Sequence, residues 1–269
     1  MPPVEARVEL LAHTPNALEL IYAAFRQCYH AGYVGEMWPR LLSGTPDRAS
    51  QAGFVAQVLA SGHASPIEHV SFTFALSGVS RALTHQLVRH RLASYSQQSQ
   101  RYVDASRFEY VMPPAVAENA AARERFTRFM EEAAEAYRDL KELLEAGASA
   151  QAIRPGTAEM ADARAGAKAN EDARFVLPQA AETRIVATMN CRALLNFFEQ
   201  RCCMRAQWEI RAVAKKMLDL CRNVLPEVFA SAGAKCERLK YCPEGERFSC
   251  GRYPLALGRR CALRPQPPS

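Results

Sequence analysis

The most constraining feature of the sequence is a strict alternation of apolar and polar residues between Val70 and Leu76. In the run VSFTFAL, every second side chain is large and apolar, and those between them are small or hydroxylated. Because successive side chains of a strand point to opposite faces of a sheet, this pattern predicts a β-strand with one buried face. The stretch SGVS that follows predicts a break, and residues 81–91 predict a short helix that buries Leu83 and Leu87.

Three other segments have the periodicity of amphipathic helices. Residues 14–30 and 117–147 repeat apolar side chains every three or four positions, and Gly147 is expected to end the second helix. Residues 190–224 predict either one long helix or two helices in succession. The helix at 117–147 is expected to carry these side chains on its apolar face: Phe126, Phe129, Met130, Ala133, Tyr137, Leu140 and Leu144.

Composition and charge narrow the class of protein. The chain has 269 residues, 49% of them hydrophobic, and no apolar run reaches the roughly 18 residues of a membrane span. The N-terminus lacks the regions of a secretion signal, so we expect a cytoplasmic protein whose nine cysteines are reduced. The net charge is +6, and many arginines cluster in residues 89–101 and 184–211, which suits a small polyanionic ligand. An RNA-binding module is the alternative interpretation of this charge.

Residues 89–102 concentrate polar groups at the end of the predicted short helix. They read RHRLASYSQQSQRY, and the helix is expected to give way to a loop there. The planar guanidinium group of arginine donates paired hydrogen bonds to phosphate and imide oxygens, and serine hydroxyls complete such a shell. The segment therefore predicts a nucleotide pocket. The other interpretation is a solvated helix end held by salt bridges.

The order of residues in this segment resembles a known family. Arg-His-Arg at 89–91, then seven residues and Ser99, extended by Gln100-Arg101-Tyr102, is similar to the signature of the flavin-dependent thymidylate synthases. Further segments resemble that family in the same order: His63-Ala-Ser-Pro-Ile-Glu-His69, Arg174-Phe-Val-Leu-Pro178, and Asn190-Cys-Arg-Ala-Leu-Leu-Asn196 followed by Arg201. The resemblance covers roughly residues 10–230.

The resemblance implies roles for individual residues. Arg201 matches the position that activates dUMP through N3 of the uracil, and it is the residue to which we assign catalysis. The residues expected around dUMP are Gln86, Leu87, Val88, Arg89, Gln97, Gln98, Ser99, Gln100, Arg101, Arg174 and Arg201. The residues expected around FAD are Ser65, Arg89, His90, Arg91, Gln97, Asn190, Cys191, Arg192 and Asn196. Ser99 is assigned to binding, because serine is a weak nucleophile without an adjacent base, and no metal-binding residue is assigned.

The resemblance also implies a fold, a reaction and an assembly. We expect an α+β fold, mainly an antiparallel β-sheet flanked by helices, with long helices packing at oligomer interfaces. The implied reaction is reductive methylation of dUMP to dTMP, with 5,10-methylenetetrahydrofolate as carbon donor and NADPH-reduced FAD as hydride source. The implied assembly is a homotetramer with shared active sites and no nucleic-acid or membrane partner. A flavin- or nucleotide-binding regulator without synthase activity is the main competing hypothesis.

Two residues of these segments allow more than one interpretation. Asn190 can cap a helix as well as contact FAD. Gln97 stands where the family often has an acidic residue, and Ser96 where asparagine is frequent, so the interaction made at position 97 is open. His63 and His69 are not assigned to the site, because buried or capping histidines would explain them equally well.

The segment after about residue 232 changes to Gly, Pro, Arg and Cys. The predicted division is a catalytic domain at 1–232 and a tail at 233–269. In the tail, the cysteines are separated by five, seven and ten residues, which is not the spacing of a standard zinc knuckle: Cys236, Cys242, Cys250 and Cys261. The pair Cys202-Cys203 could join them. Reduced thiols are expected, and a metal site or a disulfide is the alternative.

Overall fold

The computed structural model describes residues 3–151 and 158–256, which fold into two compact units. Unit 1 comprises Met1–Arg7, Ala75–Arg89 and Tyr95–Ala187, and unit 2 comprises Val8–Phe74, His90–Ser94 and Thr188–Ser269. Cys261 and the end of the predicted tail lie outside the described residues. None of the described helices is both long and apolar enough to cross a membrane.

One four-stranded sheet has the strand order β1-β2-β4-β3. The strands are β1 Arg7–His13, β2 Ser71–Ser80, β3 Ala93–Gln97 and β4 Glu182–Asn190. Hydrogen bonds join the end of one strand to the start of its neighbour: Thr14 N to Ser71 O, Cys191 N to Val70 O, and Gln98 N to Arg184 O. All three neighbouring pairs are therefore antiparallel, and the expected α+β fold with an antiparallel sheet is confirmed.

Strand β2 forms because its alternating pattern buries one face. Phe72 and Phe74 are fully buried, as the sequence predicts. The strand continues through the stretch 77–80, however, so the predicted break is wrong. Gly78 makes this possible, because it has φ +63° and a Cβ added there would lie 2.0 Å from the backbone oxygen of Glu5. Only glycine permits this approach of the two backbones.

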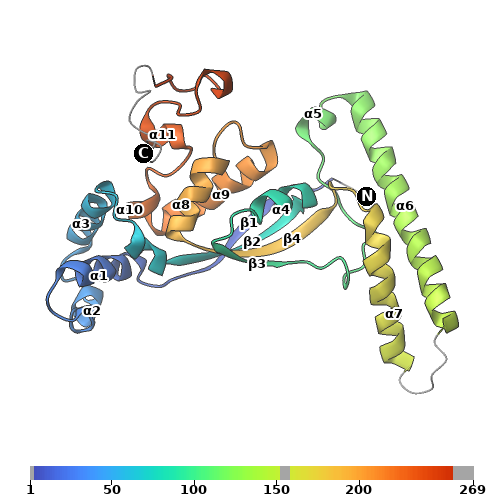
Figure 1. The fold of residues 1–269 in the computed structure, drawn as a ribbon, viewed down its shortest axis with the longest axis horizontal. Coiled ribbons are helices and arrows are strands. Elements are labelled where there is room, and N and C mark those ends of the chain that lie inside the picture. The colour runs from blue at the N-terminus through green and yellow to red at the C-terminus, as the bar shows by residue number, and fades with distance from the viewer. Residues whose placement is uncertain (1–2, 152–157, 257–269) are drawn as a thin grey trace, which may run out of the picture. The chain divides into compact units, whose positions relative to one another are not determined.

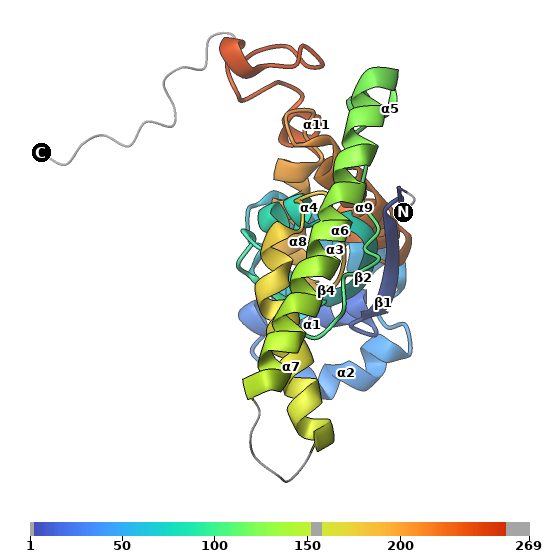
Figure 2. The ribbon, with the colours of Figure 1, turned by 90° about the vertical axis from the view of Figure 1, so that its right-hand side faces the viewer.

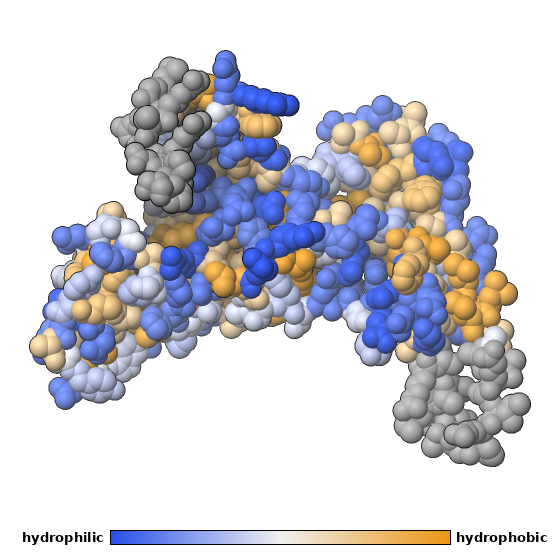
Figure 3. All heavy atoms as spheres, viewed as in Figure 1, coloured by the Kyte–Doolittle hydropathy of each residue, from blue (hydrophilic) through white to orange (hydrophobic). Residues whose placement is uncertain are grey.

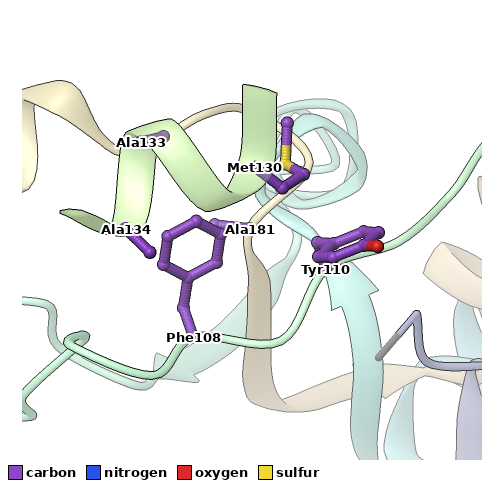
Figure 4. Packing of buried hydrophobic residues seen from close by; sticks show 6 residues of the cluster. All are labelled: Phe108, Tyr110, Met130, Ala133, Ala134 and Ala181. Carbon is purple, nitrogen blue, oxygen red and sulfur yellow. The ribbon is translucent and has the colours of Figure 1, made fainter. Parts of the chain in front are cut away.

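The helices of unit 1 are α4 Arg81–Leu87, α5 Pro114–Ala117, α6 Ala120–Gln151, α7 Ala158–Ala173 and the 3₁₀ turn η2 Arg174–Val176. Helices α6 and α7 pack side by side (Figures 1 and 2). A cluster around α6 forms the core, as Figure 4 shows: Phe108, Tyr110, Met130, Ala133, Ala134 and Ala181. Burial of Met130, Ala133 and Tyr137 confirms the predicted apolar face, whereas Phe129, Leu140 and Leu144 remain 38–44% exposed.

The helices of unit 2 surround aromatic side chains. They are α1 Ala17–Tyr29, α2 Val34–Leu42, α3 Arg48–Ala60, α8 Cys191–Arg201, α9 Trp208–Val224, α10 Pro226–Phe229 and α11 Lys235–Leu239, with the 3₁₀ turns η1 Ser65–His69 and η3 Glu246–Phe248. Phe229 packs edge-on against Phe72 and Phe198, at centroid distances of 5.6 and 6.0 Å. Helix α8 is thereby anchored against strand β2.

Several predicted boundaries differ from the structure. Helix α4 ends at Leu87 and not near Arg91, and the loop expected in 89–102 contains strand β3. Gly147 lies inside α6 and does not end it. The segment 190–224 forms two helices, which is one of the two arrangements expected from the sequence. The second begins where the Gln207 side chain accepts hydrogen bonds from two backbone N–H groups.

Candidate functional site

His90 and Arg201 form a hydrogen-bonded pair in unit 2. Arg201 Nε donates to His90 Nε2 across 3.0 Å, and the imidazole packs edge-on against Phe197 at 4.9 Å. Burial and the charge of Arg201 lower the pKa of His90 to about 4. The imidazole is therefore neutral at pH 7, and its Nε2 is an acceptor. The bond uses one of the five N–H donors of the guanidinium group, so the pair fixes Arg201 without consuming its binding capacity.

Residues of two predicted site segments meet at the start of α8. Glu68, in η1, accepts a hydrogen bond from Arg192 at 2.5 Å, although the two residues are 124 positions apart in the chain. Asn190 is the N-cap, and its Oδ1 accepts from Ala193 N at 2.8 Å. The side chain of Ser65 is exposed at the start of η1. This arrangement gathers a serine hydroxyl, a guanidinium group and a helix N-terminus in one place.

Asn196 and Arg201 line a hollow of about 390 Å³ in unit 2. Both come from α8, where Asn196 is exposed and its Oδ1 accepts from Gln200 Nε2 at 2.7 Å. The other walls of the hollow come from the linker after α8 and from residues 234–252. Burial lowers the pKa of Arg201 from its usual value, but the guanidinium group remains the charged form at neutral pH.

Gln97 in unit 1 is held by two hydroxyl groups. Its Nε2 donates to Thr84 Oγ1 at 3.1 Å and to Thr183 Oγ1 at 3.2 Å. The Thr84 hydroxyl donates its own proton to Arg81 O at 3.0 Å, so it can accept from an amide at position 97 but has no proton left for a carboxylate. The structure thus gives a physical reason for a glutamine at this position.

A second hollow, of about 700 Å³, lies in unit 1. Three consecutive residues expected around dUMP line it, namely Gln98, Ser99 and Gln100. Arg107 and Arg184 line the same hollow together with Asp104, Glu109 and Glu182, and Arg184 is paired with Glu182 at 3.5 Å. Ser99 Oγ accepts from Arg101 N at 3.2 Å, which shapes the loop after β3.

Two more of the arginines expected around dUMP, Arg101 and Arg174, converge on Glu171. Arg101 forms an ion pair with the carboxylate of Glu171 at 2.9 Å, and Arg174 Nε donates to the backbone oxygen of the same residue at 3.2 Å. The charge of Arg174 and, more strongly, burial lower the pKa of Arg81. The positive charges of Arg81, Arg101 and Arg174 therefore lie around the C-terminal end of α7.

The remaining expected residues are less uniform in exposure. Arg89, Arg91 and Val88 are exposed, and Gln86 is half-buried with Nε2 3.5 Å from the backbone oxygen of Ala82. The side chains of Leu87 and Cys191 are fully buried, and burial raises the pKa of the Cys191 thiol to about 12. In the described conformation neither residue is accessible to a ligand.

Sequence reasoning missed the residues that orient the site. Thr84, Thr183 and Glu171 carry no local signal, because they lie 13 to 86 positions from the side chains they hold. Glu68 belongs to a segment that resembles the family, yet the sequence did not indicate its bond to Arg192. The pairing of His90 with Arg201 was likewise not predicted, since 111 positions separate them.

Comparisons with known proteins identify the family of the chain. Residues 9–227 match the family described as thymidylate synthase complementing protein. The flavin-dependent thymidylate synthase of Nitratidesulfovibrio vulgaris is 70% identical over 255 residues, which cover 95% of this chain and 98% of that protein. The flavin-dependent thymidylate synthase of Clostridium tetani is 45% identical over 246 residues, with coverage of 91% and 93%.

A solved structure shares the fold. It is a UMP/dUMP methylase, PolB from Streptomyces cacaoi, bound with 5-Br dUMP, and it aligns with a TM-score of 0.64 at 24% identity, covering 84% of this chain and 94% of that one. At this identity the match concerns the fold alone. The family match and the two relatives confirm the resemblance carried by the Arg-His-Arg segment, and the chain belongs to the family of flavin-dependent thymidylate synthases.

Proposed function

We propose that the chain catalyses the reductive methylation of dUMP to dTMP, with 5,10-methylenetetrahydrofolate as carbon donor and NADPH as the source of the hydride. The observation that carries the proposal is the bond between Arg201 and neutral His90. It presents a fixed cation whose remaining N–H donors can bind an anionic oxygen or nitrogen. The assay that tests it is anaerobic formation of dTMP from these three compounds by the FAD-loaded protein, and absence of product would leave a flavoprotein without synthase activity.

The role proposed for Arg201 follows from the chemistry of uracil. Carbon 5 of a neutral uracil is a poor nucleophile, and removal of the proton from N3 makes the ring more enolate-like. A guanidinium group against the O2/N3 edge stabilises that anion, because opposite charge favours the ionised form. Arg201 would therefore activate the ring without taking a proton itself.

The phosphate of dUMP is proposed to lie against the loop after β3. Gln98, Ser99 and Gln100 line one hollow with two arginines, Arg107 and Arg184, and with three carboxylates on its other walls. Serine hydroxyls, amide groups and guanidinium groups are the donors that phosphate prefers. The remaining residues proposed for dUMP binding are Gln86, Leu87, Val88, Arg89, Gln97, Arg101, Arg174 and Arg201.

The side chains of unit 2 suit the anionic and polar groups of FAD. Arg192 and Arg91 are exposed cations, and Ser65 and Asn196 offer exposed hydrogen-bonding groups. We propose that these four residues, with Arg89, His90, Gln97, Asn190 and Cys191, bind the cofactor. When bound, FAD supplies the redox chemistry by passing on the hydride taken from NADPH. The chain contributes position and charge.

The Arg201→Ala variant separates activation from cofactor binding. We expect it to keep FAD, judged by flavin absorbance after gel filtration, and to lose most dTMP formation, roughly 100-fold or more in kcat. Arg40→Ala is a matched control, because Arg40 is an exposed helix arginine outside both hollows. Turnover near that of the control would remove Arg201 from the catalytic role.

We also propose a homotetramer with shared active sites. The support is a stripe of exposed apolar side chains on α6, formed by Leu140, Leu143 and Leu144. At about 100° per residue these three neighbouring positions fall within about 100° of the helix circumference, so they form one surface. Figure 3 shows hydrophobic side chains, in orange, over part of this helix. The cytoplasm is the proposed location, where thiols stay reduced.

Residues 1–232 remain the proposed catalytic domain, and residues 233–269 remain the proposed tail.

A further inference from the structure

The hollow proposed for the phosphate of dUMP has more negative than positive side chains on its walls. Three carboxylates line it against two guanidinium groups: Asp104, Glu109 and Glu182, and Arg107 and Arg184. Arg184 lies 3.5 Å from Glu182, so one of these carboxylates already has a cation. A phosphate group carries roughly two negative charges at pH 7, and the carboxylates that remain would repel it. Phosphate binding therefore needs a further cation from behind the walls of the hollow.

Helix α6 supplies this cation as Lys141. Its Nζ donates a hydrogen bond to Asp104 Oδ2, 37 positions earlier in the chain, and forms an ion pair with that carboxylate. The carboxylate of Glu145, one turn further along α6, lies 3.7 Å from the same Nζ. The side chain of Lys141 is only 20% exposed, so water and salt screen its pair with Asp104 incompletely.

The carboxylate of Asp104 is fixed in place as well as neutralised. Its Oδ1 accepts a hydrogen bond from Ser106 N at 2.6 Å. Arg138, one turn before Lys141 on the same side of α6, donates to Ser106 O at 3.2 Å. Burial alone would raise the pKa of Asp104, but the hydrogen bonds from Lys141 and Ser106 hold it below its usual value. Asp104 is therefore ionised at pH 7, and its charge must be balanced if an anion is to bind beside it.

We propose that Lys141 is a positioning residue for dUMP: it neutralises Asp104 and holds that carboxylate against α6, so that the loop after β3 can bind the phosphate. This inference rests on the proposed function, which places the phosphate in this hollow. Lys141 does not line the hollow itself and acts through Asp104. Helix α6, which carries none of the residues expected around dUMP, thereby contributes to substrate affinity.

The test is the dissociation constant of dUMP, measured by calorimetric titration of the full FAD-loaded chain without folate or NADPH. Lys141→Met keeps most of the apolar stem and leaves Asp104 charged, so dUMP should bind about tenfold more weakly. Lys141→Arg keeps the cation and should recover most of the affinity. Lys168→Met is the matched control, because Lys168 is an exposed lysine that pairs with Asp172 on its own helix, α7. It should stay within about twofold of the wild type.

A compensating substitution separates the charge effect from a structural one. Lys141→Met combined with Asp104→Asn still lacks the ion pair, but the unbalanced carboxylate is gone. The affinity of this double variant for dUMP should return to within about threefold of the wild type. A merely structural role of Lys141 would leave the double variant as weak as Lys141→Met, and that result would contradict the assignment.

Asp104→Asn alone is a second variant that does not depend on the folding of Lys141→Met. It removes the negative charge and leaves Lys141 in place, so it should bind dUMP at least as tightly as the wild type. A loss of about tenfold in this variant would overturn the proposal.

The same titrations distinguish failure of this inference from failure of the proposed function. If the wild type and Lys141→Met bind dUMP with equal affinity, the role of Lys141 alone is overturned. If the wild-type chain holds FAD and has no affinity for dUMP, both are overturned, because the hollow then has no nucleotide to bind.

Discussion

His90 makes the stability of this protein sensitive to acid. Its pKa is lowered from 6.5 to about 4, so the unfolded chain binds a proton at higher pH than the folded chain does. The free energy of unfolding therefore falls as pH is lowered from 6.5 towards 4. Between pH 7 and pH 5 the loss attributable to His90 is about 1 kcal/mol, after allowance for its partial exposure.

The variant His90→Gln isolates this contribution, because an amide oxygen can still accept from Arg201 but does not titrate. Urea unfolding at pH 7 and pH 5 should show a smaller loss of stability for the variant than for the wild type. Equal losses in the two proteins would assign the acid sensitivity to other groups.

At the level of single residues, the sequence predicts which side chains are candidates but not what holds them. The Arg-His-Arg segment and Ser99 could be found because their order is local. Thr84 and Thr183, which hold Gln97, could not be found, because their contact depends on the pairing of β3 with β4 and on the position of α4. Such partners become visible only when the chain is folded.

Among the secondary-structure elements, α8 depends on its N-cap. Asn190→Ala should lower the free energy of unfolding by about 1 kcal/mol, since Ala193 N loses its acceptor. Asn190→Ser restores an oxygen acceptor and should recover most of this loss. Thermal unfolding of the wild type and the two variants measures how much the N-cap stabilises the protein.

Flavin binding by the same three proteins separates the two interpretations of Asn190. If its amide group contacts FAD, Asn190→Ser should be stable and yet bind the cofactor more weakly than the wild type. Wild-type flavin affinity in Asn190→Ser would restrict this residue to capping.

The elements themselves were predictable where one face is apolar. The alternation in β2 and the periodicity of α1 and α6 predict these elements correctly. Strand β3 was missed because its five residues, Ala93–Gln97, include one aromatic and no other large apolar side chain, so no alternation is visible. Gly147 did not end α6, because glycine only weakens a helix by about 1 kcal/mol and packing against α7 can outweigh that.

For the whole molecule, the exposed stripe on α6 predicts the assembly state. Leu143 is 71% exposed, and Leu143→Glu places a charge within the stripe. If the stripe is a subunit interface, the charge would be buried without a partner, and light scattering after gel filtration should show dissociation towards the 29.9 kDa chain.

Ala146→Glu is the matched control for this change, because Ala146 is exposed on the same helix outside the stripe. It should leave the mass of the assembly unchanged. Dissociation of the control alone, or of neither protein, would place the interface elsewhere.

Tyr137 links α6 to the loop that follows β3 in unit 1. Its hydroxyl donates to Asn170 on α7 at 3.0 Å and accepts from the backbone N–H group of Ala105 at 3.2 Å, and Ala105 itself lines the larger hollow. One phenol group thus joins α6 both to α7 and to the loop that lines the hollow. A displacement of α6 and α7 is therefore expected to displace the loop that contains Ala105 as well.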